Sequence, residues 1–338
     1  MWPVSKEREA WPDVVKIFAC AMVVLGHFTQ SMVKSGFMTS SLLYDWFQMT
    51  IYTFHVPLFF ICSGYLYQRY SRVDSLAAWG LNVRKKALAL GVPYVFFTCV
   101  TLAMKALAGD MANVAGGGVV NTLFLNPAAP YWYLYALFFM FLVVPTPATK
   151  RGVATVVGMA LALKFAWLAF GSISGPYALR IVCINLIWFA AGMGIAYFGL
   201  VARLSVKTVA VGALFLPLSV LVYTCELGDW AQFIIGVLAC LCFISIAVVY
   251  GAAWSRPSAF ARCANWTMPV FLMHTIFAAG LRVVLLKLGV ASAALHIPLG
   301  LIVGFVGPVL AMLIMERLKP LDFLVYPNRY IKLGRSNG

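Results

Sequence analysis

Residues 12–30 read PDVVKIFACAMVVLGHFTQ, and this stretch of 19 residues decides the fold. Its two formal charges, Asp13 and Lys16, stand at its beginning, and the remainder is almost entirely apolar. A helix rises about 1.5 Å per residue, so about 20 such residues cross the hydrocarbon core of a bilayer. We therefore expect this stretch to be a transmembrane helix.

Nine further apolar runs follow, which gives about ten expected transmembrane helices. Some runs contain a proline, such as Pro57 and Pro217, and neighbouring helices of a bundle satisfy the backbone groups that a proline frees. The sequence predicts an all-α, polytopic membrane bundle, with residues 1–338 forming a single integral membrane domain. The expected spans are 12–30, 48–68, 87–108, 131–148, 153–170, 179–198, 206–224, 230–251, 266–287 and 296–316.

The composition excludes a water-soluble fold. Hydrophobic residues make up 63% of the chain and charged residues 10%, whereas a soluble domain carries about 25% charged residues. A net charge of +15 would also suit a nucleic-acid-binding protein. The charges stand in short patches between the apolar runs, however, so we interpret them as topology signals and expect no nucleic-acid partner.

The distribution of Lys and Arg predicts the orientation of the bundle. With the N-terminus in the cytoplasm, the inside segments hold 18 of the 25 basic residues, and the outside segments hold only Lys34 and Lys287. Cytoplasmic loops carry an excess of Lys and Arg, so both termini are expected inside. The other five basic residues fall within spans or near their ends: Lys16, Lys105, Lys164, Arg180 and Arg282.

The remaining segments give weaker signals. The eight cysteines lie mostly in apolar runs and form no zinc pattern with histidine, so we expect neither a metal site nor an essential disulfide. The polar start of the chain predicts no cleavable signal peptide. The longest outer connection, about 109–130, contains Gly116-Gly117-Gly118 and is either a re-entrant loop or a flexible lid. No internal repeat is visible.

The first span carries the strongest candidates for chemistry, because ionisable groups are expensive in hydrocarbon. Lys16 and His27 are 11 residues apart, which places them on nearly the same helix face, roughly 16 Å apart along the axis. Asp13 stands three residues before Lys16, within reach of an ion pair. This face therefore combines a paired cation near the cytoplasm with an imidazole in the outer half.

A second histidine is expected at a similar depth. His55 lies near the outer end of the second span, which should pack antiparallel to the first. Two converging imidazoles indicate proton transfer, although a lone membrane histidine also serves as a hydrogen-bond partner of a neighbouring helix. Both interpretations stay open for His274, and His296 is expected at the outer interface.

The cytoplasmic cluster Arg84-Lys85-Lys86, with Arg69 and Arg72, is able to bind the phosphates of a nucleotide-containing donor or, alternatively, anionic lipid headgroups. Several familiar signatures are missing from the sequence. It contains no phosphate-binding loop, and its spans hold few carboxylates, which disfavours carboxylate-driven pumps and glycosidases.

Taken together, these motifs resemble the acyltransferase-3 family of membrane acyltransferases. The family's spacing of an acidic residue, a basic residue and a histidine is matched by Asp13, Lys16 and His27, although the basic residue is Lys here where the family has Arg. Other resemblances are Phe59-Phe60-Ile61-Cys62-Ser63-Gly64-Tyr65, Arg84-Lys85-Lys86 with Pro93-Tyr94, Tyr131-Trp132-Tyr133-Leu134, and His274. Phe54-His55-Val56-Pro57 resembles the fucose-O-acetylase-like branch.

The resemblance implies transfer of an acetyl or similar short acyl group from cytoplasmic acetyl-coenzyme A to a sugar hydroxyl of an extracytoplasmic polysaccharide or lipid-linked oligosaccharide. It also implies residence in the bacterial inner membrane, a role in exopolysaccharide modification, and no metal. We expect His27 to be the general base or, alternatively, to carry the acyl group itself. Lys16, held by Asp13, is expected to orient the donor or stabilise charge, and His55 to orient the acceptor or share the proton. The implied donor-binding residues are Arg84, Lys85, Lys86, Arg69, Arg72, Ser63 and Gly64, and the acceptor-binding residues are Trp132 and Tyr133.

Two other functions remain open at this point. One is a transporter or flippase of a lipid-linked saccharide, which would move its substrate without acetyl-coenzyme A; the absence of a visible repeat counts against it. The other is a ligand-sensing membrane module, which the absence of a soluble partner domain disfavours.

Overall fold

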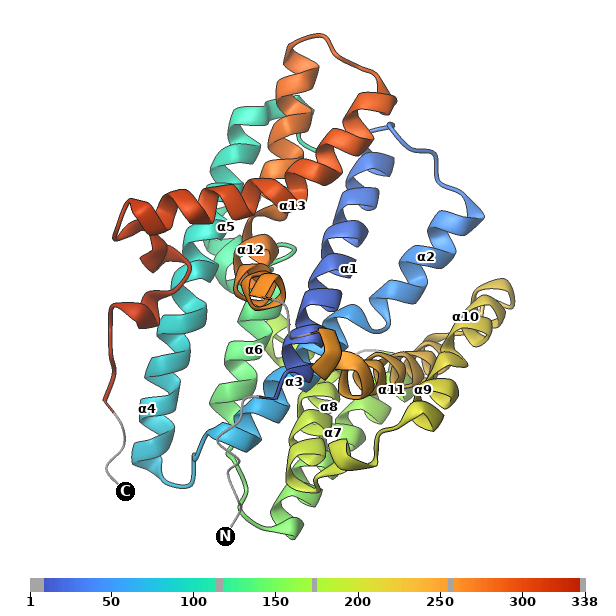
Figure 1. Ribbon diagram of the computed structural model, residues 1–338, viewed down its shortest axis with the longest axis vertical. Helices are drawn as coiled ribbons and strands as arrows, with labels where there is room; N and C mark the ends of the chain where they lie inside the picture. The colour runs from blue at the N-terminus through green and yellow to red at the C-terminus, as the bar shows by residue number, and fades with distance from the viewer. Residues whose placement is uncertain (1–8, 114–117, 172–174, 255–257, 335–338) are drawn as a thin grey trace.

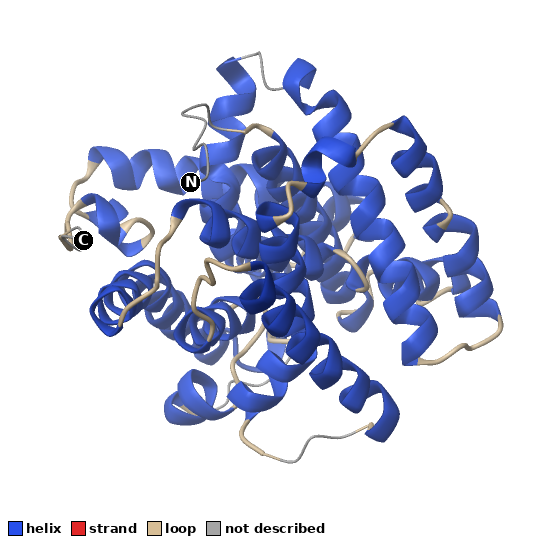
Figure 2. Ribbon diagram, turned by 90° about the horizontal axis from the view of Figure 1, so that it is seen from below, coloured by secondary structure: helices blue, strands red, loops and turns tan. Residues whose placement is uncertain are grey.

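A computed structural model describes residues 9–113, 118–171, 175–254 and 258–334. Within these ranges all regular secondary structure is helical, loops connect the helices, and there is no strand (Figure 2). Nine helical segments of the described chain are long and apolar enough to cross a membrane, and a tenth, Trp132–Val143, is apolar but shorter. The expected polytopic all-α bundle is therefore confirmed.

The helices follow the expected spans closely. Five of them correspond to one span each: α1 (Trp11–Lys34), α7 (Lys150–Phe170), α8 (Tyr177–Tyr197), α11 (Asp229–Trp254) and α13 (Ala293–Arg317). The helix α12 (Ser258–Lys287) begins several residues earlier than expected, and α6 (Trp132–Val143) is the short one. The other three spans are interrupted or extended; they comprise α2 (Leu42–Tyr52), α3 (His55–Tyr70), α4 (Leu76–Lys86), α5 (Val92–Ala108), α9 (Val206–Ala213) and α10 (Phe215–Thr224).

The second span is broken between α2 and α3. Phe54 leaves the helical region, with φ −133°, and α3 begins at His55. Proline has no backbone N–H and is tolerated in the first turn of a helix, so Pro57 fits a helix that begins at His55 and does not fit one continuous from α2. The break places His55 at the start of a new helix in the interior of the bundle.

Two other departures from the expected spans also have local causes. The helix α6 ends at Val143, where Pro145 and Pro147 follow and prevent its continuation. The third span is longer than expected, because α4 runs through the π-helical segment Ala87–Gly91 directly into α5. The basic run Arg84-Lys85-Lys86 therefore lies on a helix and not in a loop.

The centre of the bundle is formed by α1, α3 and α8, with α6, α11 and α12 packed around them (Figure 1). Contacts are densest between α3 and α8. Two glycines make this possible, because a Cβ at Gly64 would overlap with the carbonyl oxygen of Phe189, and one at Gly192 with that of Ile61. Small residues at such positions let helix backbones approach closely.

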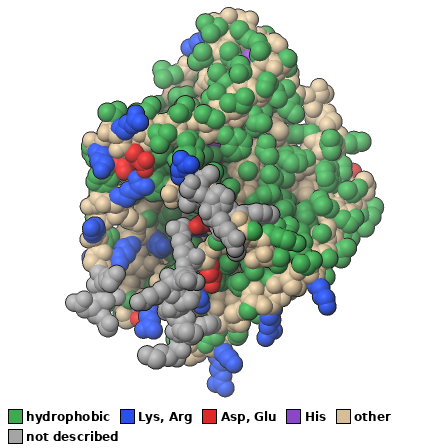
Figure 3. Space-filling model, viewed as in Figure 1, with side chains coloured by type: hydrophobic (Ala, Val, Ile, Leu, Met, Phe, Trp, Pro, Cys, Tyr) green, Lys and Arg blue, Asp and Glu red, His purple; other side chains and the backbone are tan. Residues whose placement is uncertain are grey.

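The arrangement of the connections agrees with an alternating topology. In Figure 1 the α1–α2 and α12–α13 connections lie at the top, and the α3–α4 and α6–α7 connections lie at the bottom. Most of the visible Lys and Arg side chains gather in the lower left part and along the lower edge of Figure 3. Four of the basic residues counted as inside, Lys6, Arg8, Arg256 and Arg335, lie outside the described residues, as do Gly116 and Gly117.

The predicted orientation can be tested with the native thiols. Cys225 is exposed in a connection expected outside, and Cys263 is exposed near the cytoplasmic start of α12. In sealed spheroplasts, a membrane-impermeant maleimide should therefore modify Cys225 and spare Cys263 until the membrane is permeabilised. The variants Cys225→Ser and Cys263→Ser assign each label, and modification of Cys263 alone in sealed cells would mean that the bundle is inserted the other way round.

Candidate functional site

A cavity of about 640 Å³ lies at the end of the bundle that is expected to face the cytoplasm. Four of the residues singled out in the sequence line it: Asp13 and Lys16 of α1, Ser63 of α3 and Lys86 of α4. Its other lining residues are Glu9, Pro12, Leu66, Tyr67, Tyr70, Ser71, Ala89, Leu90, Leu137 and Phe141. We call this space the inner cavity. It combines cationic and hydroxyl groups with apolar walls.

The charged groups of the inner cavity come from separate elements. The ammonium group of Lys86 lies 4.0 Å from the centroid of the Phe141 ring, so this cation is held over an aromatic face. Glu9 accepts hydrogen bonds from Trp11 Nε1, at 3.1 Å, and from the Tyr65 hydroxyl, and its carboxylate lies 3.5 Å from Arg69 Nη2. Arg69 is thereby positioned beside the cavity.

The rest of the predicted basic cluster is not brought into the cavity wall. Arg72 and Arg84 are exposed and Lys85 is half-buried, and none of the three is among the lining residues. Because the run 84–86 is helical, its three side chains point in different directions about 100° apart. Only Lys86 points toward the inner cavity.

Ser63 is fixed by contacts on both sides. Its hydroxyl lies 3.1 Å from that of Tyr133, and the next residue, Gly64, packs on the backbone of Phe189. Tyr133 is buried rather than placed at an outer mouth, and its ring contacts Phe59 and Phe271, with centroid distances of 5.5 and 5.7 Å. The structure thus gives Gly64 and Tyr133 clear packing roles.

His27 has two other imidazoles as neighbours in the outer half of the bundle. The rings of His27 and His274 are 5.5 Å apart between centroids, and His55 is a further electrostatic neighbour of His27. His27 lies deep in the bundle but keeps part of its surface accessible, whereas His55 and His274 are each only 2% exposed. The sequence predicts that His27 and His55 lie at a similar depth. The structure places a third imidazole, His274, beside His27, and the sequence alone left its role open.

Hydrogen bonds define which nitrogen each buried ring has available. Nδ1 of His274 lies 3.0 Å from the Val270 carbonyl and 2.9 Å from that of Phe271, and Nδ1 of His55 lies 2.5 Å from that of Ile51. A neutral imidazole donates to a carbonyl through a protonated nitrogen, so Nε2 carries the lone pair in both rings. Nε2 of His274 is buried without a hydrogen-bond partner in the described structure.

A polar network lies between α1 and α2 next to these rings. Gln48 Nε2 donates to the Thr29 hydroxyl at 2.7 Å and to the Gly26 carbonyl at 3.2 Å. The Tyr52 ring packs edge-on against His55, at 4.6 Å between centroids. This network fixes α2 against the turn of α1 that carries His27.

A second cavity, of about 310 Å³, lies on the outer side of Tyr52 and is called the acceptor cavity below. Its wall contains both aromatic side chains, among them Trp132, and polar groups. The lining residues are Met49, Tyr52, Thr53, Val56, Pro57, Trp132, Lys164, Trp167, Leu168, Ile184, Asn185, Trp188, Asp229, Gln232 and Phe233. Aromatic faces together with amide and carboxylate groups suit a polar ring such as a sugar.

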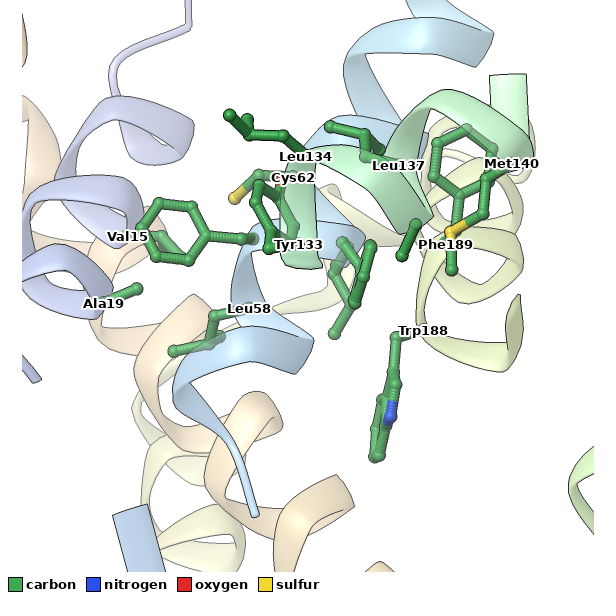
Figure 4. Close-up of a cluster of buried hydrophobic side chains, with 14 of the residues drawn as sticks. Val15, Ala19, Leu58, Cys62, Tyr133, Leu134, Leu137, Met140, Trp188 and Phe189 are labelled. Carbon is green, nitrogen blue, oxygen red and sulfur yellow. The ribbon is translucent and has the colours of Figure 1, made fainter. Parts of the chain in front are cut away.

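An aromatic layer stands between the inner cavity and the histidines. It consists of Tyr133, Phe59 and Phe271, whose rings contact one another, and Phe271 lies one helical turn before His274. The lining of the inner cavity ends on α1 at Lys16 and does not extend to His27. Figure 4 shows Tyr133 and Leu134 of α6 in one cluster with Leu58 and Cys62 of α3 and Val15 and Ala19 of α1.

The sequence left the role of His274 open and did not point to Glu9, for different reasons. His274 follows Phe271 on α12, and nothing in a single sequence shows that this helix crosses α1 at His27. Glu9 precedes the first span and looks like an ordinary surface residue, but it anchors Arg69. His296, expected at the interface, is buried against Phe37 and bonds through Nε2 to the Val290 carbonyl at 2.8 Å.

Comparison with known proteins provides independent information. Residues 9–315 match the family described as "Acyltransferase domain". The chain is also similar to the nodulation protein NolL of Mesorhizobium japonicum, with 25% identity over 172 residues. That match covers 48% of this chain and 42% of NolL, so the chain aligns with less than half of its relative. No solved structure matches significantly.

The packing of Gly64 yields a prediction about stability. In Gly64→Ala the new methyl group meets the Phe189 backbone, which cannot move aside as a flexible side chain would, so we expect a loss of about 1–3 kcal/mol and a lower Tm in detergent. Gly80→Ala, on α4, is the matched control because no atom lies within 4 Å of the added Cβ. Equal Tm values for the two variants would show that α3 and α8 are not packed this closely.

Proposed function

Because this chain belongs to the Acyltransferase domain family of membrane acyltransferases, we propose that it transfers an acyl group from cytoplasmic acyl-coenzyme A to a sugar hydroxyl on the opposite side of the membrane. The observation that carries the proposal is the placement of the predicted residues. Asp13, Lys16, Ser63 and Lys86 share one cavity at the basic end of the bundle, and the imidazole of His27 lies further along the same helix α1.

The inner cavity is the proposed site of the donor. Lys86 and Lys16 contribute cations that attract the phosphates of coenzyme A, and Arg69, paired with Glu9, supplements them at the entrance. Lys16 and His27 are separated by about 16 Å along α1. Lys16 therefore orients the donor and cannot also stabilise charge on a carbonyl held at His27.

His27 is the proposed general base. Its imidazole accepts the proton of the sugar hydroxyl while the hydroxyl oxygen attacks the carbonyl carbon of the thioester. The tetrahedral intermediate then collapses, the carbon–sulfur bond breaks, and the departing coenzyme A thiolate takes the proton back from the imidazolium. The products are the acylated sugar and free coenzyme A, so the enzyme returns to its starting protonation state.

His274 and His55 are proposed as positioning residues for this step. Each is held through Nδ1 by a carbonyl of its own chain segment, which leaves the Nε2 lone pair available. An N–H of His27 that points to such a lone pair fixes the tautomer of His27 and leaves its other nitrogen basic. In this proposal His274 and His55 orient the general base His27, as a third group orients the base in other catalytic sites.

The acceptor cavity is the proposed site of the sugar. Trp132, Trp167 and Trp188 offer aromatic faces, and Asn185 and Asp229 offer hydrogen-bonding groups to hydroxyls. Tyr52 lines this cavity and contacts His55, so a sugar bound there lies next to the histidine cluster. We propose an acetyl group as the group transferred, and a polysaccharide or lipid-linked oligosaccharide at the bacterial inner membrane as the acceptor class.

Replacement of His27 tests the base assignment. In proteoliposomes that contain labelled acetyl-coenzyme A and candidate glycans, His27→Ala should lower kcat for acetyl transfer by about 10²–10⁴-fold, since a general base contributes that much. Size-exclusion profiles and Tm values in detergent verify that the variant is folded. Full transfer activity in folded His27→Ala would refute the role of this residue, and glycan movement without acetylation in the native protein would indicate a transporter.

Replacement of Lys86 tests the donor site. We expect Lys86→Gln to raise the KM for acetyl-coenzyme A roughly tenfold with little change in kcat, because the lost interaction with phosphate is worth about 1.5–3 kcal/mol. Lys150→Gln is the matched control, since Lys150 is exposed at the start of α7, away from the cavity. A similar rise in both variants would mean that a general positive surface, and not the inner cavity, attracts the donor.

A further inference from the structure

A further cavity, of about 400 Å³, lies at the outer ends of α1, α5 and α12, away from both the inner and the acceptor cavity. Its wall is mostly apolar, but three cations stand on it, and we call it the Arg282 cavity. The lining residues are Ser31, Thr101, Met104, Lys105, Leu107, Ala108, Ala112, Asn113, Ala129, Thr275, Ile276, Ala279, Gly280, Arg282, Val283, Val284 and Lys287.

Arg282 is a buried cation without a counter-ion. It is 3% exposed, and no carboxylate of the described residues lies within 4.0 Å of it. Nη1 donates to the Ser31 hydroxyl at 2.6 Å and Nη2 to the Met111 carbonyl at 3.4 Å, whereas Nε has no partner. Burying an unpaired charge is costly, so such a residue is expected to have an anionic partner.

The surroundings hold this guanidinium in place. Asn113 Nδ2 donates to the carbonyl of Ser31 at 2.9 Å and contacts its hydroxyl at 3.1 Å. The Ser31 hydroxyl is thus fixed between Asn113 and Arg282. A preorganised guanidinium binds a phosphate with little loss of side-chain entropy, since its planar fork matches two phosphate oxygens.

Three further cations of the outer half lie at or near this cavity, whereas Lys164 and Arg180 lie elsewhere. Lys105 and Lys287 line the Arg282 cavity, and Lys34 is an electrostatic neighbour of Lys105. The outer connections are expected to contain only two basic residues, Lys34 and Lys287. Lys287 lines this cavity and Lys34 is near it, so basic residues are scarce in the other outer connections. Like charges repel, and no carboxylate of the described residues lies within 4.0 Å of any of the four, so an anion that joined them would relieve this repulsion.

The cavity opens toward the lipid. Leu107 and Val284 stand on its wall with 79% and 53% of their surface exposed. In a membrane-spanning helix, exposed leucine and valine side chains face hydrocarbon. A ligand with an apolar chain therefore has a lateral path to the cations.

We propose that the Arg282 cavity binds the phosphate group of a lipid in the outer leaflet, with the phosphate on Arg282 and Lys105 and the chain along the apolar wall. Two lipids share this chemistry, namely a phospholipid and a polyprenyl phosphate that carries a saccharide. The second source rests on the proposed function, because it would tether the sugar acceptor to the enzyme beside the histidine cluster.

Native mass spectrometry of the purified full-length chain tests the site with two matched pairs of probes. One pair is a long-chain prenyl phosphate and the corresponding prenyl alcohol, and the other is phosphatidylglycerol and a diacylglycerol with the same chains. We expect retention of the phosphate-bearing member of at least one pair over its phosphate-free partner. The pair that shows the greater preference identifies the source of the phosphate.

Variants locate the binding. Arg282→Gln should reduce retention of the phosphate lipid about tenfold, which corresponds to about 1.4 kcal/mol, and Arg180→Gln should leave it unchanged, because Arg180 is exposed elsewhere at the outer side. If Arg282→Gln does not fold, Lys105→Gln, at the half-exposed end of the cavity, replaces it and should also reduce retention.

The proposal is overturned if the native protein retains phosphate-bearing and phosphate-free lipids equally. It is also overturned if the folded Arg282 variant, or the Lys105 variant used in its place, binds as the native protein does, or if Arg180→Gln loses as much. The measurement needs no acyl-coenzyme A, so a loss of lipid binding and a loss of transfer activity are distinguished.

Discussion

The close contact between the backbones of α3 and α8 is the constraint on which the site depends. Gly64 and Gly192 let the two helices approach until side chains no longer fit between them. The helix α3 carries His55 at its beginning and Ser63 and Arg69 toward its end. The fixed position of α3 therefore sets the depth of His55 on the outer side of the bundle and of Ser63 and Arg69 on the inner side. The break before His55 frees α3 from the direction of α2, so that α3 can follow α8.

Charge is distributed in the bundle according to what a low-dielectric environment tolerates. Cations at the inner cavity lie at the basic end of the molecule, near Glu9 and Asp13. Nδ1 of His274 bonds to carbonyls of its own helix and Nδ1 of His55 to the Ile51 carbonyl of α2, which removes the cost of an unsatisfied N–H in these two rings. Only Arg282 carries a full charge into the interior without a described acid beside it, and for that reason it stands out from the other basic residues.

Much of this was accessible from the sequence, because the bilayer imposes a simple rule on length and hydrophobicity. The ten apolar segments follow from length and hydrophobicity. The stripe of Asp13, Lys16 and His27 and the similar depth of His27 and His55 are predictions from helical periodicity and a short connection. The break at Phe54 was not predicted, since Pro57 alone is compatible with a kinked span as well. His274 and Glu9 lie at the site because of contacts between segments distant in sequence. Arg84 does not line the inner cavity, because the residues 84–86 are helical and their side chains point in different directions. Those outcomes depend on tertiary packing that no local pattern encodes.

The aromatic layer of Tyr133, Phe59 and Phe271 has a consequence for the cell as well as for chemistry. An enzyme with a hollow on each side of an energised membrane would dissipate the proton gradient if the two hollows joined into a continuous water column. Tyr133, Phe59 and Phe271 come from α6, α3 and α12, and they pack on one another next to Ser63 and one helical turn before His274. Any molecule, water included, that moved between Ser63 and His274 past these rings would have to displace them.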